Sequence, residues 1–90
     1  MNHSKSFFIL DQGNNSEFIL RACLSFEEIF NEINYIFMSI YFRNHGLFSK
    51  IIITKFENDL YELEIQIIME KKEKSKVLSL IRKANYVNIN

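Results

Sequence analysis

The chain has 90 residues, enough for one domain with a modest hydrophobic core. Hydrophobic residues make up 48% of it, which excludes an intrinsically disordered chain. Its 11 basic and 11 acidic residues cancel, so we expect neither nucleic acid nor an anionic membrane surface as the main partner. The sequence has no run of about twenty uncharged apolar residues, so no transmembrane helix is expected. A single cysteine, Cys23, excludes an internal disulfide and favours a cytoplasmic location.

The first part of the chain predicts two strands. Residues 1–6 are polar and are expected to be disordered. Phe7–Leu10 is a short strand-like run, and Glu17–Cys23 alternates between two faces as a strand does. The Gly- and Asn-rich residues 11–16 between them are typical of a turn. The first run could add a strand at an edge of the main sheet, or pair with a second subunit.

A long helix is predicted to follow, starting at Ser25 and stopping at Gly46. Ser25 and Glu28 have the spacing of a capping box, in which each side chain accepts a hydrogen bond from the other residue's backbone N–H. Leu24 and Ile29 are placed for a hydrophobic staple around that cap. One apolar stripe at helical spacing is expected to face the sheet: Phe26, Ile29, Phe30, Ile33, Phe37, Ile40 and Tyr41.

The same helix carries a second apolar stripe, formed by Tyr35, Met38 and Phe42. One interpretation is a wide core face whose long apolar side chains wrap around its edges. The other is a surface that covers a partner protein, because apolar patches on small domains often mark interfaces.

The strand predicted over Leu47–Phe56 is unusual because Ile51, Ile52 and Ile53 place apolar groups on both of its faces. Such a strand is either buried on both sides or paired with another chain. The second candidate protein-binding surface is therefore the Ile52 or Ile53 side of this strand, with Ile68 opposite on the next strand.

The remaining elements complete a recognisable order. A tight turn at residues 57–59 leads into an alternating strand, Leu60–Met69, followed by a helix over Glu70–Ala84 and a short strand over Tyr86–Ile89. The order strand, helix, strand, strand, helix, strand predicts an α+β fold of the ferredoxin-like βαββαβ type. We expect a two-layer sandwich in a single domain spanning residues 1–90, with two helices on one face of a four-stranded antiparallel sheet.

Residues 17–90 resemble an ACT-type regulatory domain. Residues 42–51, FRNHGLFSKI, are similar to the ACT pattern of a helix that ends at Gly before a strand, and residues 63–89 to its closing strand, helix and strand. The small subunit of acetolactate synthase is one analogue; the YbeD-like family is another, through NDLYEL at residues 58–63. The turn at residues 22–25 lacks the Gly of the ACT effector site. The resemblance therefore implies a fold and a dimerising or partner-binding habit, without an effector.

No constellation of residues predicts catalysis, a metal site or a cofactor. Cys23 has no nearby His to activate it, and His3 and His45 share no ligand spacing with Cys or carboxylates. Glu62 and Glu64 are better explained as charges on a solvent face than as paired catalytic carboxylates. The charge run at residues 71–76 is better explained as a solvated helix start than as a phosphate-binding surface.

These observations predict a non-catalytic protein-binding or regulatory domain that acts through a homodimer or a larger protein. The alternative is a small bacterial, phage or mobile-element inhibitor, of the anti-defence or immunity type, that blocks a larger target by protein contact. A third hypothesis, nucleic-acid binding on the open sheet face, is disfavoured by the acidic Glu62 and Glu64 on that face.

Overall fold

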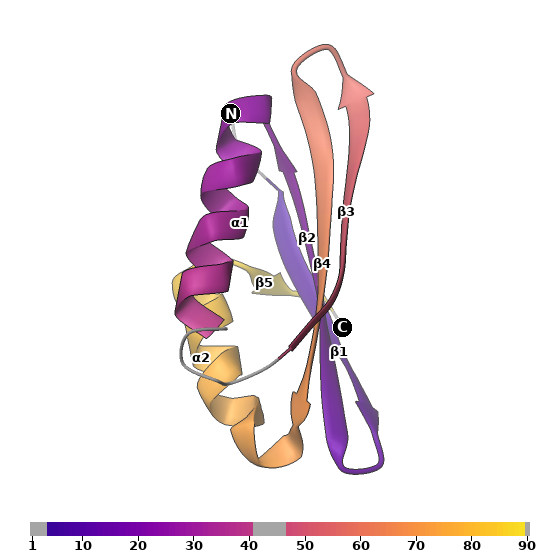
Figure 1. Cartoon of the computed structure of the whole chain (residues 1–90), viewed down its shortest axis with the longest axis vertical. Helices are drawn as coiled ribbons and strands as arrows, with labels where there is room; N and C mark the ends of the chain where they lie inside the picture. The colour runs from indigo at the N-terminus through magenta and orange to yellow at the C-terminus, as the bar shows by residue number, and fades with distance from the viewer. Residues whose placement is uncertain (1–3, 41–46, 90) are drawn as a thin grey trace.

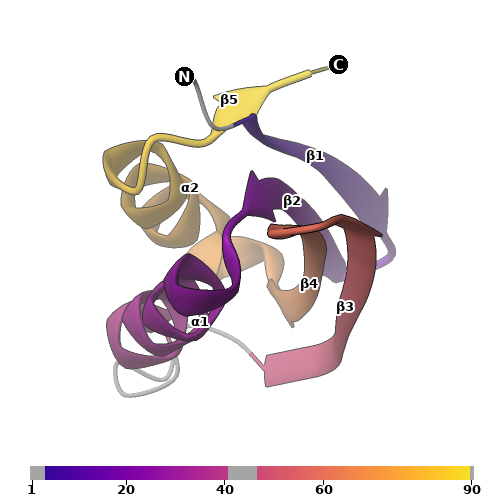
Figure 2. The same cartoon turned by 90° about the horizontal axis from the view of Figure 1, so that it is seen from above.

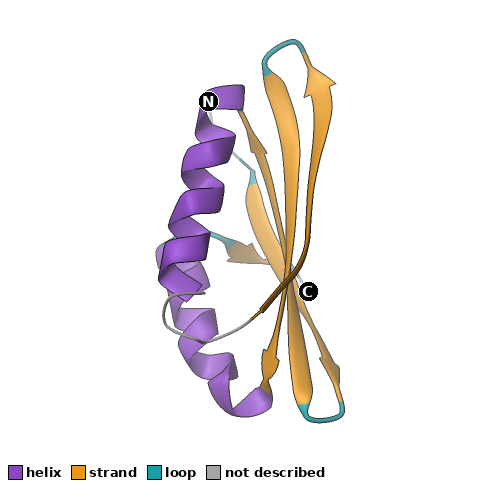
Figure 3. Cartoon of the chain, in the orientation of Figure 1, coloured by secondary structure: helices purple, strands orange, loops and turns teal. Residues whose placement is uncertain are grey.

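The protein forms two layers, a five-stranded sheet and a pair of helices on one face of it (Figures 1 and 2). The computed structural model describes residues 4–40 and 47–89. Figure 3 shows how helices and strands separate into the two layers. The elements are β1 (Lys5–Gln12), β2 (Asn15–Leu24), α1 (Phe26–Ile40), β3 (Leu47–Glu57), β4 (Leu60–Glu70), the 3-10 helix η2 (Lys71–Glu73), α2 (Lys74–Lys83) and β5 (Val87–Asn88).

The strands lie in the order β3-β4-β2-β1-β5, and the sheet is mixed because β5 runs parallel to β1. The α+β class and the two-layer arrangement are confirmed. The expected four-stranded, all-antiparallel ferredoxin-like sheet is wrong, because β1 lies between β2 and β5 and not at an edge of the main sheet. The cause is local: β1 forms a hairpin with β2 and so occupies the position beside β2 that the last strand of a ferredoxin-like sheet would take.

The β1–β2 hairpin is longer at both ends than the sequence suggested. Gly13 closes its turn with φ of 59°, a left-handed conformation that glycine adopts without a steric penalty. At the other end Lys5 and Ser6, which we expected to be disordered, pair with Ala22 and Arg21. The hairpin thus begins two residues earlier than its apolar run indicates, because backbone pairing does not require apolar side chains.

The core lies between the helices and the helix-facing side of β2 and β4. The alternation predicted for β4 is confirmed, since Leu63, Ile65, Ile67 and Met69 are buried. In α1 the buried residues are Ile29, Ile36 and Ile40. The predicted stripe is therefore wrong in part: it omitted Ile36 and included Phe26 and Phe30, both about half exposed. The helix turns its isoleucines to the sheet, which places these two phenylalanines on its flank.

The predicted capping box at the start of α1 is confirmed. The Ser25 backbone N–H donates to Oε1 of Glu28 over 3.0 Å, and the Glu28 N–H donates to Oγ of Ser25 over 3.4 Å. Leu24 and Ile29, the predicted staple, both belong to the buried core. The predicted end of this helix, including Tyr41, Arg43, His45 and Gly46, lies outside the described residues.

The second helical segment begins as the 3-10 helix η2 at Lys71 and continues as α2 to Lys83. The predicted helix is therefore confirmed to within one residue at each end, with Glu70 belonging to β4 instead. The buried residues of α2 are Val77 and Ile81. After α2, Asn85 takes a left-handed conformation with φ of 70°, which turns the chain back toward the sheet. Tyr86 is buried there, and only Val87–Asn88 form the last strand.

Candidate functional site

Strand β3 is an edge strand with apolar side chains exposed on both faces. It pairs with β4 on one side and is the outermost strand of the sheet (Figure 2). The exposed fractions are 41% for Ile51, 36% for Ile52 and 45% for Ile53. The interpretation that this strand is buried on both sides within the chain is therefore wrong. An apolar edge of this kind is uncommon in soluble domains, which usually protect such strands with charges or short length.

The helical layer explains the exposure, because it covers β4 but does not extend over β3. Ile51 and Ile53 lie opposite Ile65 and Leu63 of β4 in the strand register, so all four residues share the helix-facing side. Ile65 and Leu63 are fully buried beneath the helices, whereas their neighbours on β3 remain exposed. The helix-facing side of the sheet is thus buried at β4 and exposed at Ile51 and Ile53 of β3.

A cluster of aromatic side chains, Phe26 and Phe30 of α1 with Tyr61 of β4, lies on this helix-facing side. The Phe26 ring centroid is 5.3 Å from that of Phe30 and 5.5 Å from that of Tyr61 on β4. Tyr61 in turn lies opposite Lys55 of β3. The exposed rings of Phe26 and Phe30 therefore lie beside the half-buried Tyr61, whose neighbour on β3 is Lys55. Phe26 and Phe30 were expected to face the sheet, but both are offset on the helical wheel from the buried Ile29, Ile36 and Ile40.

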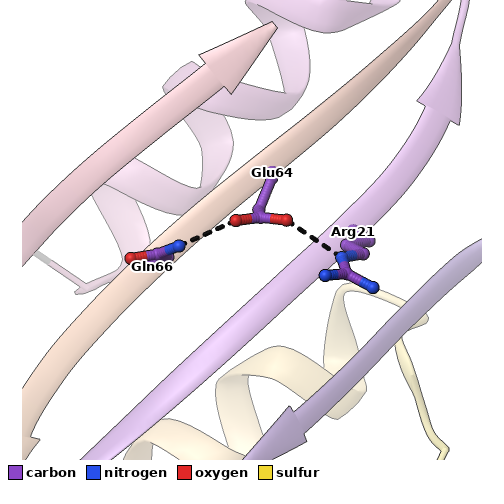
Figure 4. Close-up of polar contacts among 3 residues, drawn as sticks. All are labelled: Arg21, Glu64 and Gln66. Carbon is purple, nitrogen blue, oxygen red and sulfur yellow. Dashed lines mark hydrogen bonds and ion pairs between the residues drawn. The ribbon is translucent and has the colours of Figure 1, made fainter. Parts of the chain in front are cut away.

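Neither α1 nor α2 covers the opposite face of the sheet, which carries a polar network (Figure 4). The Arg21 Nε donates to Oε1 of Glu64 over 3.0 Å, and the Gln66 Nε2 donates to Oε2 of Glu64 over 2.7 Å. The Gln66 and Arg21 hydrogen bonds hold the pKa of the Glu64 carboxyl below its ordinary value, against a smaller opposing effect of burial. The charges of Glu64 and Arg21 are therefore satisfied within the chain.

Ile52 and Ile68, both predicted to bind a partner, flank this network and are each 36% exposed. In the register Ile52 lies directly opposite Glu64, so it adjoins the network from the β3 side. The structure thus places both isoleucines on one open face. Ile52 also belongs to the exposed edge, where its neighbours Ile51 and Ile53 are exposed as well, whereas the residues on either side of Ile68 are buried.

The second stripe of α1 lies apart from that face. Tyr35 and Met38 are about half exposed on the helix, which fits both interpretations: long side chains at the edge of a wide core face, and a surface that covers a partner. Phe42, the third member, lies outside the described residues. Because α1 packs on the covered side of the sheet, the stripe and the Ile52–Ile68 surface belong to opposite sides of the molecule. Their roles in binding stay predictions.

The other polar clusters have partners within the fold. Lys74 and Ser16 both bind the Asp11 carboxylate, at 2.8 Å and 2.6 Å, and these hydrogen bonds, Lys74 first, lower its pKa. Cys23 is a free thiol of intermediate exposure. Within residues 4–40 and 47–89, no group of three or more His, Cys, Asp or Glu side chains is placed to hold a metal ion. No helix in those ranges is long and apolar enough to cross a bilayer.

The fold and its exposed edge define a small two-layer α+β domain with a five-stranded mixed sheet. Compared with protein-family models, curated proteins and solved structures, the chain matches none of them. The feature that bears most directly on function is therefore the exposed edge strand β3.

Proposed function

We propose that this domain is a non-catalytic binding module that acts by pairing its edge strand β3 with another protein chain, a second copy of itself included. The observation that carries the proposal is the exposure of Ile51, Ile52 and Ile53 on both faces of an outermost strand. An outermost strand presents unpaired backbone N–H and C=O groups, and an added strand satisfies them. The isoleucines would lose water contact in the same event, so the hydrogen bonds and the hydrophobic effect act together.

We further propose that this binding is regulatory, as the resemblance of residues 17–90 to ACT domains implies. The order of elements from β2 to β5 supports that resemblance. The place of β1, between β2 and β5, is a departure from it. A dimerising or partner-binding role survives this departure because β3 and β4 lie at the other end of the sheet.

A second candidate function is inhibition of a larger protein by contact, and a specific observation favours it. Tyr35 and Met38 expose apolar surface on α1, away from the β3 edge. A chain with two separate apolar surfaces could bind its own copy through one and a larger target through the other.

The test compares Ile53→Lys with wild type and with Leu10→Lys, a control that adds the same charge at an exposed leucine of β1. Each variant is co-expressed, tagged and untagged, and chains that copurify with the tag are quantified by mass spectrometry. We expect Ile53→Lys to lose the associated chains and Leu10→Lys to retain them, because a charged edge residue opposes strand pairing. Full retention by Ile53→Lys would refute the proposal.

A further inference from the structure

We infer that the chain paired with β3 is β3 of a second copy, running antiparallel about a two-fold axis at Ile52. This inference rests on the proposed function and names its partner. The resulting dimer would contain one continuous sheet, with the helices of both copies on the same side. Such an interface is isologous, so it closes on itself and leaves neither copy with an unpaired β3 edge.

The symmetry limits the possible registers. Directly opposite residues of antiparallel strands point to the same face of a sheet. A two-fold axis perpendicular to the sheet runs between the two strands. It must therefore lie midway between one residue and the same residue of the second copy. The strand is regular between its two irregularities, at Phe48/Lys50 and Lys55/Glu57, which leaves Lys50–Lys55 as the segment able to pair without distortion.

The side chains of that segment select Ile52 as the central residue. With the axis there, Ile51 lies opposite the partner's Ile53, so all three isoleucines lie opposite isoleucines. Lys50 then lies opposite the partner's Thr54. Axes at Lys50 or Lys55 would place two lysines directly opposite each other, which is destabilising. Axes at Ile51, Ile53 or Thr54 would place a lysine opposite an isoleucine.

The dimer also matches the exposure of β3 on both faces. On the helix-facing side, Ile51 and Ile53 of each copy would form one group of four isoleucines across the axis. On the open face, the two Ile52 side chains would meet at the axis, beside the Glu64 of each copy that lies opposite Ile52. A single pairing event thus shields every isoleucine that the isolated strand exposes.

Cysteine cross-linking measures the register directly. Cys23→Ser removes the native thiol, and Ile51, Ile52, Ile53 and Thr54 are then changed singly to cysteine. Opposite residues of antiparallel strands have Cα atoms about 4.5–5.5 Å apart, within the range for a disulfide. We expect rapid disulfide dimers for Ile52→Cys alone, since two cysteines at Thr54 would lie about 14 Å apart along the strand. A mixture of Ile51→Cys and Ile53→Cys should cross-link between the two variants.

Sedimentation of the full chain completes the test. We expect a dimer whose dissociation constant rises at least about thirtyfold in Ile53→Lys, the effect of losing a hot-spot residue. Circular dichroism confirms that the variant is folded. Leu10→Lys is again the control and should leave the dissociation constant unchanged.

The outcomes separate the inference from the proposed function. A dimer that dissociates in Ile53→Lys but cross-links at another position, or at none, would overturn the register and leave strand binding standing. A protein that is still monomeric at about 1 mM would overturn the self-pairing, because its free energy of association would be weaker than about 4 kcal/mol. A dimer unaffected by Ile53→Lys would overturn the self-pairing, and retention of all copurifying chains by the same variant would overturn the proposed function as well.

Discussion

The Tyr86 hydroxyl donates a 2.7 Å hydrogen bond to Oε2 of Glu32, joining the segment after α2 to the middle of α1. Lys5 of β1 binds the same oxygen at 2.9 Å and lies 4.8 Å from the centre of the Tyr86 ring. The three residues therefore tie the two helices to the inserted strand β1. Burial raises the pKa of the Tyr86 phenol far above its ordinary value of 10.0, and the hydrogen bond to Glu32 adds to the shift.

Tyr86→Phe should destabilise the protein by about 2 kcal/mol at neutral pH, the cost of losing a hydrogen bond to a charged group. The phenol stays protonated in the folded state while the unfolded chain ionises above pH 10, so its contribution is present below pH 10 and is lost as the pH rises further. The difference between wild type and variant should therefore shrink by about 1.4 kcal/mol per pH unit above that value. Denaturant unfolding of wild type and Tyr86→Phe at pH 7 and pH 11 measures the change in this difference.

Tyr35→Phe is the matched control, because it removes a phenol hydroxyl from an exposed side chain. A difference between wild type and Tyr86→Phe that stays constant up to pH 11 would contradict the assignment of the hydrogen bond.

Lys74→Met should raise the pKa of the Asp11 carboxyl toward its ordinary value of 3.8, because it removes the largest cause of the lowered pKa. Carbon-detected NMR of the side-chain carboxyl during an acid titration measures this. A depressed pKa means that Asp11 contributes stability above pH 3.8, and that this contribution is lost as the pH falls through the lower folded pKa. The control is Lys72→Met, which removes an ammonium that pairs with Glu70. It should leave the pKa of Asp11 unchanged.

Ser25→Ala should cost about 1 kcal/mol by removing the acceptor of the Glu28 N–H at the start of α1. Ser79→Ala, at an exposed position inside α2, should be close to neutral, since alanine is the better helix former. The midpoints of urea unfolding compare the two variants. Equal midpoints for wild type and Ser25→Ala would show that the cap does not stabilise the helix.

Met38→Glu should change the free energy of unfolding by no more than about 0.5 kcal/mol, because the side chain is largely solvated. It should also leave the β3-mediated dimer intact while weakening any complex with a larger protein that uses the α1 stripe. Thermal unfolding and sedimentation measure these effects. Loss of cooperative unfolding would place Met38 in the core instead.

Patterns that act over short distances were enough to predict most elements. The capping box needs only Ser25 and Glu28, three residues apart, and the alternation of β4 needs only neighbouring residues. The buried positions of α2 follow from helical spacing in the same way. The extent of β1 was missed because Lys5 and Ser6 join the sheet through their backbones.

Properties that depend on distant parts of the chain could not be read in this way. Whether β5 pairs with β1 or β2 depends on the hairpin that forms some sixty or more residues earlier. The rotation of α1, which buries Ile36 and exposes Phe30, depends on where the helix rests on β2 and β4. The run Ile51–Ile53 did indicate an unusual strand, but its exposure depends on how far the helical layer reaches.

Amide hydrogen exchange along β3 tests the central claim most directly. In the region Lys50–Thr54, alternate N–H groups point away from β4, and strand pairing would bond them to a second chain. We predict that these amides become protected as the protein concentration rises, in wild type and in Leu10→Lys, and that they exchange rapidly in Ile53→Lys. Rapid exchange of the same amides in an associated wild-type protein would contradict the account, because association would then use another surface.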